Sequence, residues 1–241
     1  MNFGLNLIKN VLKDVWMNTQ EDKEGLGSNM KIVFATGNAH KVQEVNDIAK
    51  GSGIEFELPP DGFNPLENGL TFEENSLIKA QEAARISGRI SLADDSGLCV
   101  EALNGEPGIY SARYDTTPQK RIDKLLNNLT EVANRRAKFV CAMTLVDKDG
   151  KTIRQEVGEC HGKIAHTQTG NNGFGYDPIF IPDGYDITIA QMSEEEKNTI
   201  SHRSRALRKM IEFVNSWSLD AQSYSDTDNN YSGDNFSKIC H

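Results

Sequence analysis

Residues 91–114, SLADDSGLCVEALNGEPGIYSARY, give the strongest single indication of the fold and of a functional site. In this segment a short apolar run leads directly into two adjacent carboxylates. Residues 90–93 have the composition of the end of a buried strand, and Asp94 and Asp95 follow directly. Neighbouring like charges repel each other unless a cation or a hydrogen-bond network compensates them. The pair therefore indicates a divalent-metal site or a base of tuned pKa. The alternative is a strand-to-loop turn whose carboxylates accept backbone N–H groups.

The bulk properties limit the class of protein. The chain has 241 residues, of which 37% are hydrophobic, and a formal net charge of −9. This length and apolar content allow one large globular domain or two small ones. The negative charge argues against nucleic acid as a partner, whereas a small anionic substrate needs only a local basic pocket. No apolar run is long enough to span a bilayer, so we expect no membrane partner.

The cysteines indicate a reducing compartment. Cys99, Cys141, Cys160 and Cys240 are widely spaced, form no CxxC pair and follow no secretory signal. We therefore expect reduced thiols in a cytoplasmic protein, with the first three packed as small apolar residues.

The two ends of the chain differ in composition from the middle. In residues 1–29, apolar side chains recur near helical spacing before a polar segment, which predicts an amphipathic helix and a linker. Residues 219–241 are polar and rich in Ser, Asp and Asn, so we expect a disordered tail. The core domain is then residues 30–218.

The core begins with a pattern that suits an anion. Residues 31–35, KIVFA, predict a buried strand, and a glycine-containing turn separates it from a predicted helix at 42–50. Free backbone N–H groups and the helix dipole both favour an anion at such a turn, and Lys41 would reach a phosphate as a point charge. The Walker A spacing is absent, so a plain strand–helix connection with an exposed lysine fits equally well.

An acidic block precedes a predicted helix at residues 76–87. Thr71 and Glu74 have the spacing of a capping box, which explains both residues structurally. Glu67 and Glu74 are also oxygen ligands placed shortly before the aspartate pair, and Mg²⁺ prefers oxygen ligands with room left for water and phosphate. The block is therefore a candidate part of a metal site.

The second half of the chain predicts a strand pair. Residues 139–146 and 151–159 have β-forming composition, and the turn signal DKDG at 147–150 joins them. After a first half that resembles a β-α-β unit, this pair indicates a mixed sheet with two lobes. Clefts between lobes are where substrates usually bind.

Two later segments are candidates for substrate contact. The glycine-rich segment 170–178 carries Phe174 and Tyr176, either of which could stack on a flat base; the alternative is a hairpin with a structural tyrosine. Lys197, His202 and Arg203 form a basic cluster on an acidic chain. Such a cluster suits an anionic substrate, although a solvated helix face is the alternative.

Six blocks of the chain together resemble the signatures of the inosine triphosphate pyrophosphatase family, also called dITP/XTP diphosphatases. The resemblance is collinear from about residue 30 to residue 217 and lies in ATGNAHK at 35–41, TFEENSLIKA at 71–80, LADDSGL at 92–98, PGIYSARY at 107–114, FGYDPIF at 174–180 and SHRSRAL at 201–207. Any one block is a weak match, whereas six in order are specific.

The resemblance implies an α/β fold with an elongated mixed β-sheet, flanking helices and two lobes around a central nucleotide-binding cleft. It implies Mg²⁺-dependent hydrolysis of ITP, dITP and XTP to the monophosphate and pyrophosphate, and a homodimer. It makes Asp95 the metal-linked general base. The implied substrate-binding residues are Thr36, Gly37, Asn38, Ala39, His40, Lys41, Ser96, Phe174, Gly175, Tyr176, Asp177, Lys197, His202 and Arg203, and the implied metal ligands are Glu67, Glu74, Asp94 and Asp95.

One position departs from the family pattern. The family often has a metal-binding acid three positions before the glycine of the TFEEN block, where this chain has Leu66 next to Glu67. Either Glu67 substitutes after a local shift, or metal binding relies on Asp94, Asp95 and Glu74. Two other interpretations stay open: a Maf-like nucleotide pyrophosphatase with another base preference, and a non-catalytic nucleotide sensor.

Overall fold

The structure is a computed structural model that describes residues 29–228, so the predictions for residues 1–28 and 229–241 lie outside it. Residues 29–210 form one compact unit, and residues 211–228, the last part of a long helix, belong to a second unit. None of the described helices combines the length and apolar composition needed to cross a bilayer.

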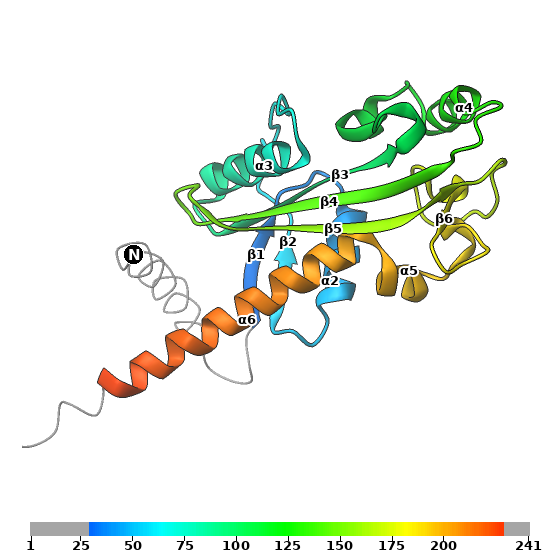
Figure 1. Ribbon diagram of the computed structural model, residues 1–241. Helices are drawn as coiled ribbons and strands as arrows, with labels where there is room; N and C mark the ends of the chain where they lie inside the picture. The colour runs from blue at the N-terminus through cyan, green and yellow to red at the C-terminus, as the bar shows by residue number, and fades with distance from the viewer. Residues whose placement is uncertain (1–28, 229–241) are drawn as a thin grey trace, which may run out of the picture. The chain divides into compact units, whose positions relative to one another are not determined.

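A six-stranded mixed sheet forms the centre of the first unit (Figure 1). Its spatial order is β2-β1-β3-β4-β5-β6. The first three strands are parallel, and β3 to β6 are paired antiparallel. In chain order the strands are β1 Met30–Phe34, β2 Ile54–Glu57, β3 Ser91–Val100, β4 Arg136–Val146, β5 Thr152–Ile164 and β6 Phe180–Pro182. The predicted α/β class and mixed sheet are confirmed, and one sheet runs through this whole unit.

Helices flank the sheet on both sides. Figure 1 shows α3 on one side of β3, β4 and β5 and the start of α6 on the other. The helices are α2 Ala39–Ala49, α3 Phe72–Ser87, α4 Pro118–Asn128, α5 Glu194–Ile200 and α6 His202–Asp228, and the 3-10 turns are η1 Glu101–Leu103, η2 Gly108–Arg113, η3 Asp177–Ile179 and η4 Ile189–Gln191.

Local sequence explains where α3 begins and ends. The hydroxyl of Thr71 accepts the backbone N–H of Glu74, which is the predicted N-cap, and Gly88 ends the helix in the left-handed conformation that glycine favours. Ala80, Ala83 and Ala84 are fully buried. Small side chains on this face let α3 lie close to β3 and β4, which fixes the position of the charged residues that α3 carries.

The aspartate pair does not end a strand, as the sequence suggested. Strand β3 continues through Asp94 and Asp95 to Val100, and Asp95 lies opposite Ala142 in the antiparallel register with β4. The prediction of a strand-to-loop turn at this pair is therefore wrong. The strand persists because the β4 ladder satisfies its backbone while cations from helices compensate the two carboxylates, as described below.

A glycine allows α6 to approach the sheet. At Gly158 in β5, an added Cβ atom would meet the backbone carbonyl of His202 and lie 2.5 Å from the backbone nitrogen of Ala206. This distance is shorter than any real Cβ contact, so only glycine fits. The contact positions the first turns of α6, which carry His202 and Arg203, over the sheet.

Helix α6 also extends past the point where the sequence predicts disorder. The expected tail begins at residue 219, whereas the helix continues to Asp228. Helix propagation is much easier than nucleation, so a helix that is already formed in a packed region can run on through polar residues.

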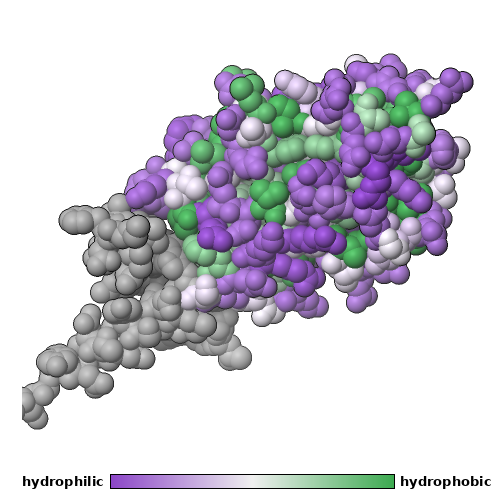
Figure 2. All heavy atoms as spheres, in the orientation of Figure 1, coloured by the Kyte–Doolittle hydropathy of each residue, from purple (hydrophilic) through white to green (hydrophobic). Residues whose placement is uncertain are grey.

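The surface of the described residues in Figure 2 is mainly hydrophilic, with hydrophobic side chains scattered over it. An apolar cluster lies inside, between the antiparallel strands and α4, and includes Leu98, Leu125 and Phe180. The buried Cys141 and Cys160 pack as the sequence predicts, and the three cysteines of the described region are free thiols.

Candidate active site

The turn between β1 and α2 has the predicted strand–turn–helix form. The backbone N–H of Asn38 donates to the hydroxyl of Thr36 over 3.1 Å, and the Asn38 carbonyl accepts the N–H of Lys41 at the start of α2. Thr36 is buried, whereas Gly37, Asn38 and Ala39 are exposed. His40 lies in the first turn of α2. The turn therefore presents a helix N-terminus to solvent, as an anion site requires.

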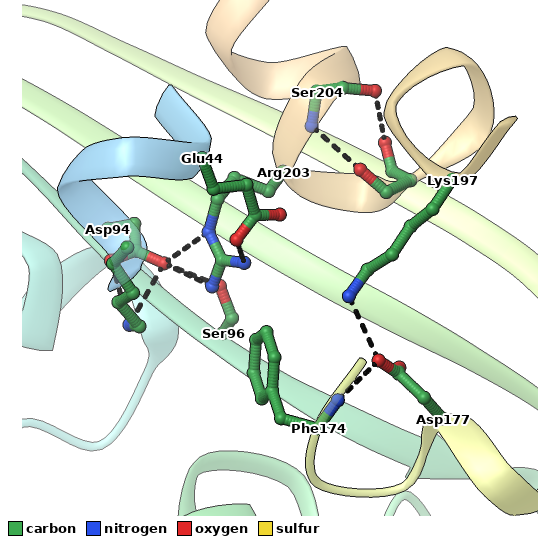
Figure 3. A network of polar contacts seen from close by, with 10 residues as sticks. Glu44, Asp94, Ser96, Phe174, Asp177, Lys197, Arg203 and Ser204 are labelled. Atoms are coloured by element: carbon green, nitrogen blue, oxygen red, sulfur yellow. Dashed lines mark hydrogen bonds and ion pairs between the residues drawn. The ribbon is translucent and has the colours of Figure 1, made fainter. Parts of the chain in front are cut away.

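Asp94 is the centre of a buried ionic network (Figure 3). Its carboxylate accepts the Lys41 ammonium at 3.0 and 3.3 Å and the Arg203 guanidinium at 2.9 and 3.1 Å. The Ser96 hydroxyl donates to it over 3.1 Å, and Arg203 also donates to Glu44 over 2.9 Å. Burial alone would raise the pKa of Asp94, but Lys41 and Arg203 outweigh it and hold the pKa well below its usual range. Asp94 is therefore an ionised residue of β3 whose ion pairs link this strand to α2 and α6.

Asp95 lies on the opposite face of the sheet, because successive side chains of a strand alternate. One of its oxygens, Oδ1, accepts the ammonium of Lys79 from α3 at 2.7 Å, and the other, Oδ2, is buried without a hydrogen-bond partner. Burial raises the pKa of Asp95, and the charge of Lys79 offsets only part of this effect. The pKa of Lys79 is also raised, since the carboxylates around it outweigh its burial. Asp95 is thus a carboxylate with a free oxygen and increased proton affinity.

Glu67 is the acid that reaches the Asp95 side of the sheet. Its carboxylate is 3.7 Å from the Lys79 ammonium, while the neighbouring Leu66 is 77% exposed. Glu74 instead accepts the backbone N–H of Leu70 over 2.6 Å. Thr71 therefore caps α3 as predicted, but the Glu74 half of the predicted capping box is replaced by this bond to Leu70.

No three His, Cys, Asp or Glu side chains within residues 29–228 are grouped closely enough to hold a metal ion by themselves. Mg²⁺, however, commonly takes only one or two carboxylates and fills its other positions with water and phosphate oxygens. The free Oδ2 of Asp95 and the nearby Glu67 carboxylate fit this pattern. Asp94 does not, because both of its oxygens already accept cationic donors.

The loop before η3 presents an aromatic ring between cations. Phe174 is 55% exposed, and its ring lies 4.6 Å from the Lys197 ammonium and 5.7 Å from the Arg203 guanidinium. Asp177 holds this arrangement: its Oδ2 accepts the Phe174 N–H and the Lys197 ammonium, both at 2.9 Å (Figure 3). Burial raises the pKa of Asp177, and Lys197 opposes the shift. A flat ring with adjacent N–H donors is a surface on which a purine can stack.

A cavity of about 420 Å³ lies beside this ring. Lys41 and Asn38 from the β1–α2 turn line it together with Phe174 and Lys197, so the structure brings the predicted phosphate loop and the predicted base segment to one place.

Tyr176 is not part of this surface. It is 4% exposed, and its hydroxyl donates to the Ser111 carbonyl over 3.0 Å. The structural alternative is therefore correct for Tyr176, and Phe174 is the ring available for stacking. Gly175, between them, has a φ of +63° that glycine adopts without strain.

Sequence reasoning missed two charged residues. Lys79 lies four residues before Ala83 on the buried side of α3, and Glu44 lies three residues after Lys41 on α2. The available signal was a charged residue at helical spacing on a face that is otherwise apolar. The partners of Lys79 and Glu44 were not predictable, because Asp95 and Arg203 come from other segments of the chain.

His202 is buried in neutral form. Its ring stacks on Phe139 with centroids 4.8 Å apart, and its Nδ1 has no partner. Burial, together with the charges of Arg203 and Lys197, holds the pKa of His202 well below its usual range, against the opposing effect of Asp94.

This burial predicts a pH dependence of stability. An unfolded chain binds a proton at histidine below about pH 6.5, whereas folded His202 does not, so the free energy of unfolding falls as pH falls below that value. At pH 5.5 the expected loss relative to pH 7.5 is about 1.4 kcal/mol. Urea unfolding at both pH values measures it, and His202→Asn should remove this part of the difference. An equal pH dependence in the variant would contradict the assignment.

The structure is thus an α/β protein with a mixed sheet, in which the N-terminus of α2 and the exposed ring of Phe174 lie at one cavity. Residues 32–213 match the Ham1 family, and the chain belongs to that family.

Three relatives show how close the similarity is. The chain is 43% identical to a dITP/XTP pyrophosphatase of Gloeobacter violaceus over 180 residues, 75% of this chain and 92% of the relative. It is 45% identical to a dITP/XTP pyrophosphatase of Bacillus cereus over 202 residues, 79% and 98% of the two chains. The solved structure of the Staphylococcus aureus Ham1 protein superposes with a TM-score of 0.69 at 41% identity and covers 77% of this chain and 98% of its own.

Proposed function

We propose that the protein hydrolyses the triphosphates of deaminated purines, ITP, dITP and XTP, to the monophosphate and pyrophosphate. The names of its relatives in the Ham1 family support this activity. The observation that carries the proposal for this chain is the free Oδ2 of Asp95, a buried carboxylate oxygen held in place by Lys79.

In the proposed reaction, Asp95 acts as general base. Its raised pKa brings the carboxylate closer to the working pH, which makes it a better proton acceptor for a water that attacks phosphorus. Lys79 fixes the direction of the carboxylate through Oδ1 and leaves Oδ2 free, and the two lone pairs of Oδ2 allow it to accept that water and to face a cation at the same time. Strand β1 pairs with β3 only as far as Leu92, so the edge of β3 beyond that pair is not covered by β1. A triphosphate that crosses this edge would meet Lys41 and the N-terminus of α2, which offset its negative charge, on one face and Asp95 on the other.

Glu67 and Asp95 are the residues that we propose would hold Mg²⁺. When bound there, Mg²⁺ would offset charge on the triphosphate. Glu74 and Asp94, the other two predicted ligands, are left out because their carboxylates are already engaged.

The base would stack on Phe174, with the Lys197 ammonium, which lines the same cavity, near its edge. A 6-oxopurine offers a hydrogen-bond acceptor there, whereas adenine offers an amino donor. Cationic N–H groups therefore favour the oxo base and leave adenine with unpaired donors, which is an efficient way to discriminate between substrates. Asp177 keeps Lys197 beside the ring and so supports this selection.

The test is pyrophosphate release from ITP, dITP, XTP, GTP, ATP and UTP in the presence of Mg²⁺. We expect kcat/KM for dITP and XTP to exceed that for ATP by about 10²-fold or more. Phe174→Ala should raise KM for every purine substrate. Tyr185→Ala serves as the control, since Tyr185 is a similarly exposed aromatic residue at 40% exposure that does not line the cavity.

The other interpretations give different results. Preference for UTP would favour a Maf-like pyrophosphatase, and nucleotide binding without any pyrophosphate release would favour a sensor. The homodimer stays a prediction, and light scattering of the purified protein measures it.

A further inference from the structure

Residues 67–70, the Glu67 loop, are held by the first turn of α3. The side-chain oxygen Oδ1 of Asn75 accepts the backbone N–H of Gly69 over 2.9 Å, and the Glu74 carboxylate accepts that of Leu70 over 2.6 Å. Two side chains of one helical turn thus bind two successive N–H groups of the loop. These two bonds attach the backbone of the Glu67 loop to α3.

The contribution of Asn75 to stability does not by itself explain why an asparagine occupies this position. Its side chain is completely buried, yet its Nδ2 group has no hydrogen-bond partner. A buried donor without a partner lowers stability by at least as much as one hydrogen bond contributes, so the bond to Gly69 does not make Asn75 stabilising on balance. The contact with the loop is also tight, since a Cβ atom on Gly69 would lie 2.8 Å from Asn75 Oδ1. The bond to Gly69 is the interaction that Asn75 provides.

The same helix carries the lysine that links the loop to the candidate base. Lys79 lies one turn after Asn75, with its ammonium 2.7 Å from Asp95 and 3.7 Å from Glu67. Asn75 and Lys79 therefore fix, from one rigid element, the position of the Glu67 loop and the position of the Asp95 carboxylate. Because the loop carries Glu67, a shift of its backbone away from α3 would move Glu67 relative to Asp95.

We propose that Asn75 is a positioning residue, which holds the Glu67 loop so that the Glu67 and Asp95 carboxylates face a shared divalent cation. This inference rests on the proposed function, because it concerns the same metal site. It assigns a role to a residue that touches neither the cation nor the substrate. Supporting residues of this kind commonly change metal affinity by about 10- to 100-fold.

The experiment measures Mn²⁺ binding to the nucleotide-free protein by water-proton relaxation. We expect Asn75→Leu to weaken Mn²⁺ binding about 10-fold. Glu67→Gln should weaken it at least as much, and the double variant should bind no more weakly than Glu67→Gln alone, because Asn75 acts only through Glu67. Additive losses in this double-mutant cycle, or unchanged binding in Asn75→Leu, would overturn the proposal.

Two further variants separate positioning from general damage. Gly69→Ala acts on the same contact from the loop side, outside the buried core, and should weaken Mn²⁺ binding as Asn75→Leu does. Asn46→Leu is the matched control, because Asn46 clamps the backbone of Phe56 with bonds of 2.8 and 2.9 Å in another part of the sheet. It should leave Mn²⁺ binding unchanged, and a loss there equal to that of Asn75→Leu would assign the effect to stability.

The same data distinguish the two levels of inference. Wild-type protein that binds Mn²⁺ and cleaves dITP, together with an Asn75→Leu variant of unchanged Mn²⁺ affinity, would remove the role of Asn75 and leave the proposed function intact. Wild-type protein that binds no Mn²⁺ would remove the metal site, and the role of Asn75 with it.

Discussion

Asp95→Asn is expected to lower kcat for dITP by about 10²- to 10⁴-fold, the range that a positioned general base contributes. The amide keeps the shape of the side chain but cannot accept the proton of the attacking water. Lys79 loses the charge of Asp95 yet retains Glu67 at 3.7 Å, so the fold should persist. Steady-state pyrophosphate release, with circular dichroism as the check on folding, measures the effect.

The matched control for Asp95→Asn is Asp147→Asn. Asp147 is also a buried aspartate, but it accepts the backbone N–H groups of Asp149 and Lys151 in the β4–β5 hairpin. Its substitution should leave kcat within a few-fold of wild type. A fully folded Asp95→Asn protein with near-normal kcat would show that another group accepts the proton.

Asp94→Asn is expected to act on stability rather than on proton transfer. Removing one partner of a buried ion pair leaves an uncompensated charge, here the Arg203 guanidinium, and typically lowers the free energy of unfolding by about 3–5 kcal/mol. Arg203 is 2% exposed, so water cannot replace the lost carboxylate. We expect a loss of about 3 kcal/mol, at the lower end, because Glu44 still binds Arg203. Urea unfolding at pH 7 measures it.

An exposed ion pair provides the comparison for Asp94→Asn. Asp183 pairs with Arg136 at 2.6 Å, but both side chains are about half exposed, at 51% and 47%. Surface pairs contribute about 0–1 kcal/mol, so Asp183→Asn should have a small effect. If Asp94→Asn were no more destabilising than Asp183→Asn, Asp94 would not be the structural tie that we describe.

These two predictions assign different roles to Asp94 and Asp95, and the sequence alone does not distinguish those roles. Asp94 and Asp95 are neighbours with the same chemistry, and the sequence offered a joint metal site for both. The alternation of a strand sends their carboxylates to opposite faces of the sheet, where different helices supply their partners. The sequence predicted strand β3 only up to this pair, because the compensating cations come from residues that lie far away along the chain.

Local patterns in the sequence were sufficient for much of the fold. Apolar runs marked β1, most of β4 and β5 and the start of β3, Thr71 marked the start of α3, and the DKDG turn marked the β4–β5 hairpin. Each of these depends on residues close together in the chain, so local physical rules apply. The collinear blocks also predicted the family, which the match over residues 32–213 confirms.

The sequence by itself therefore determined many of the helices and strands of this protein, its α/β class and its family, because short-range periodicity and capping depend on residues that lie close together in the chain. Only the tertiary structure decided which aspartate is free, that Phe174 rather than Tyr176 is exposed, and that Lys79 and Glu44 belong to the site. Burial and charge pairing depend on which distant segments pack together, and the packing of helices on the two faces of the sheet settles that choice.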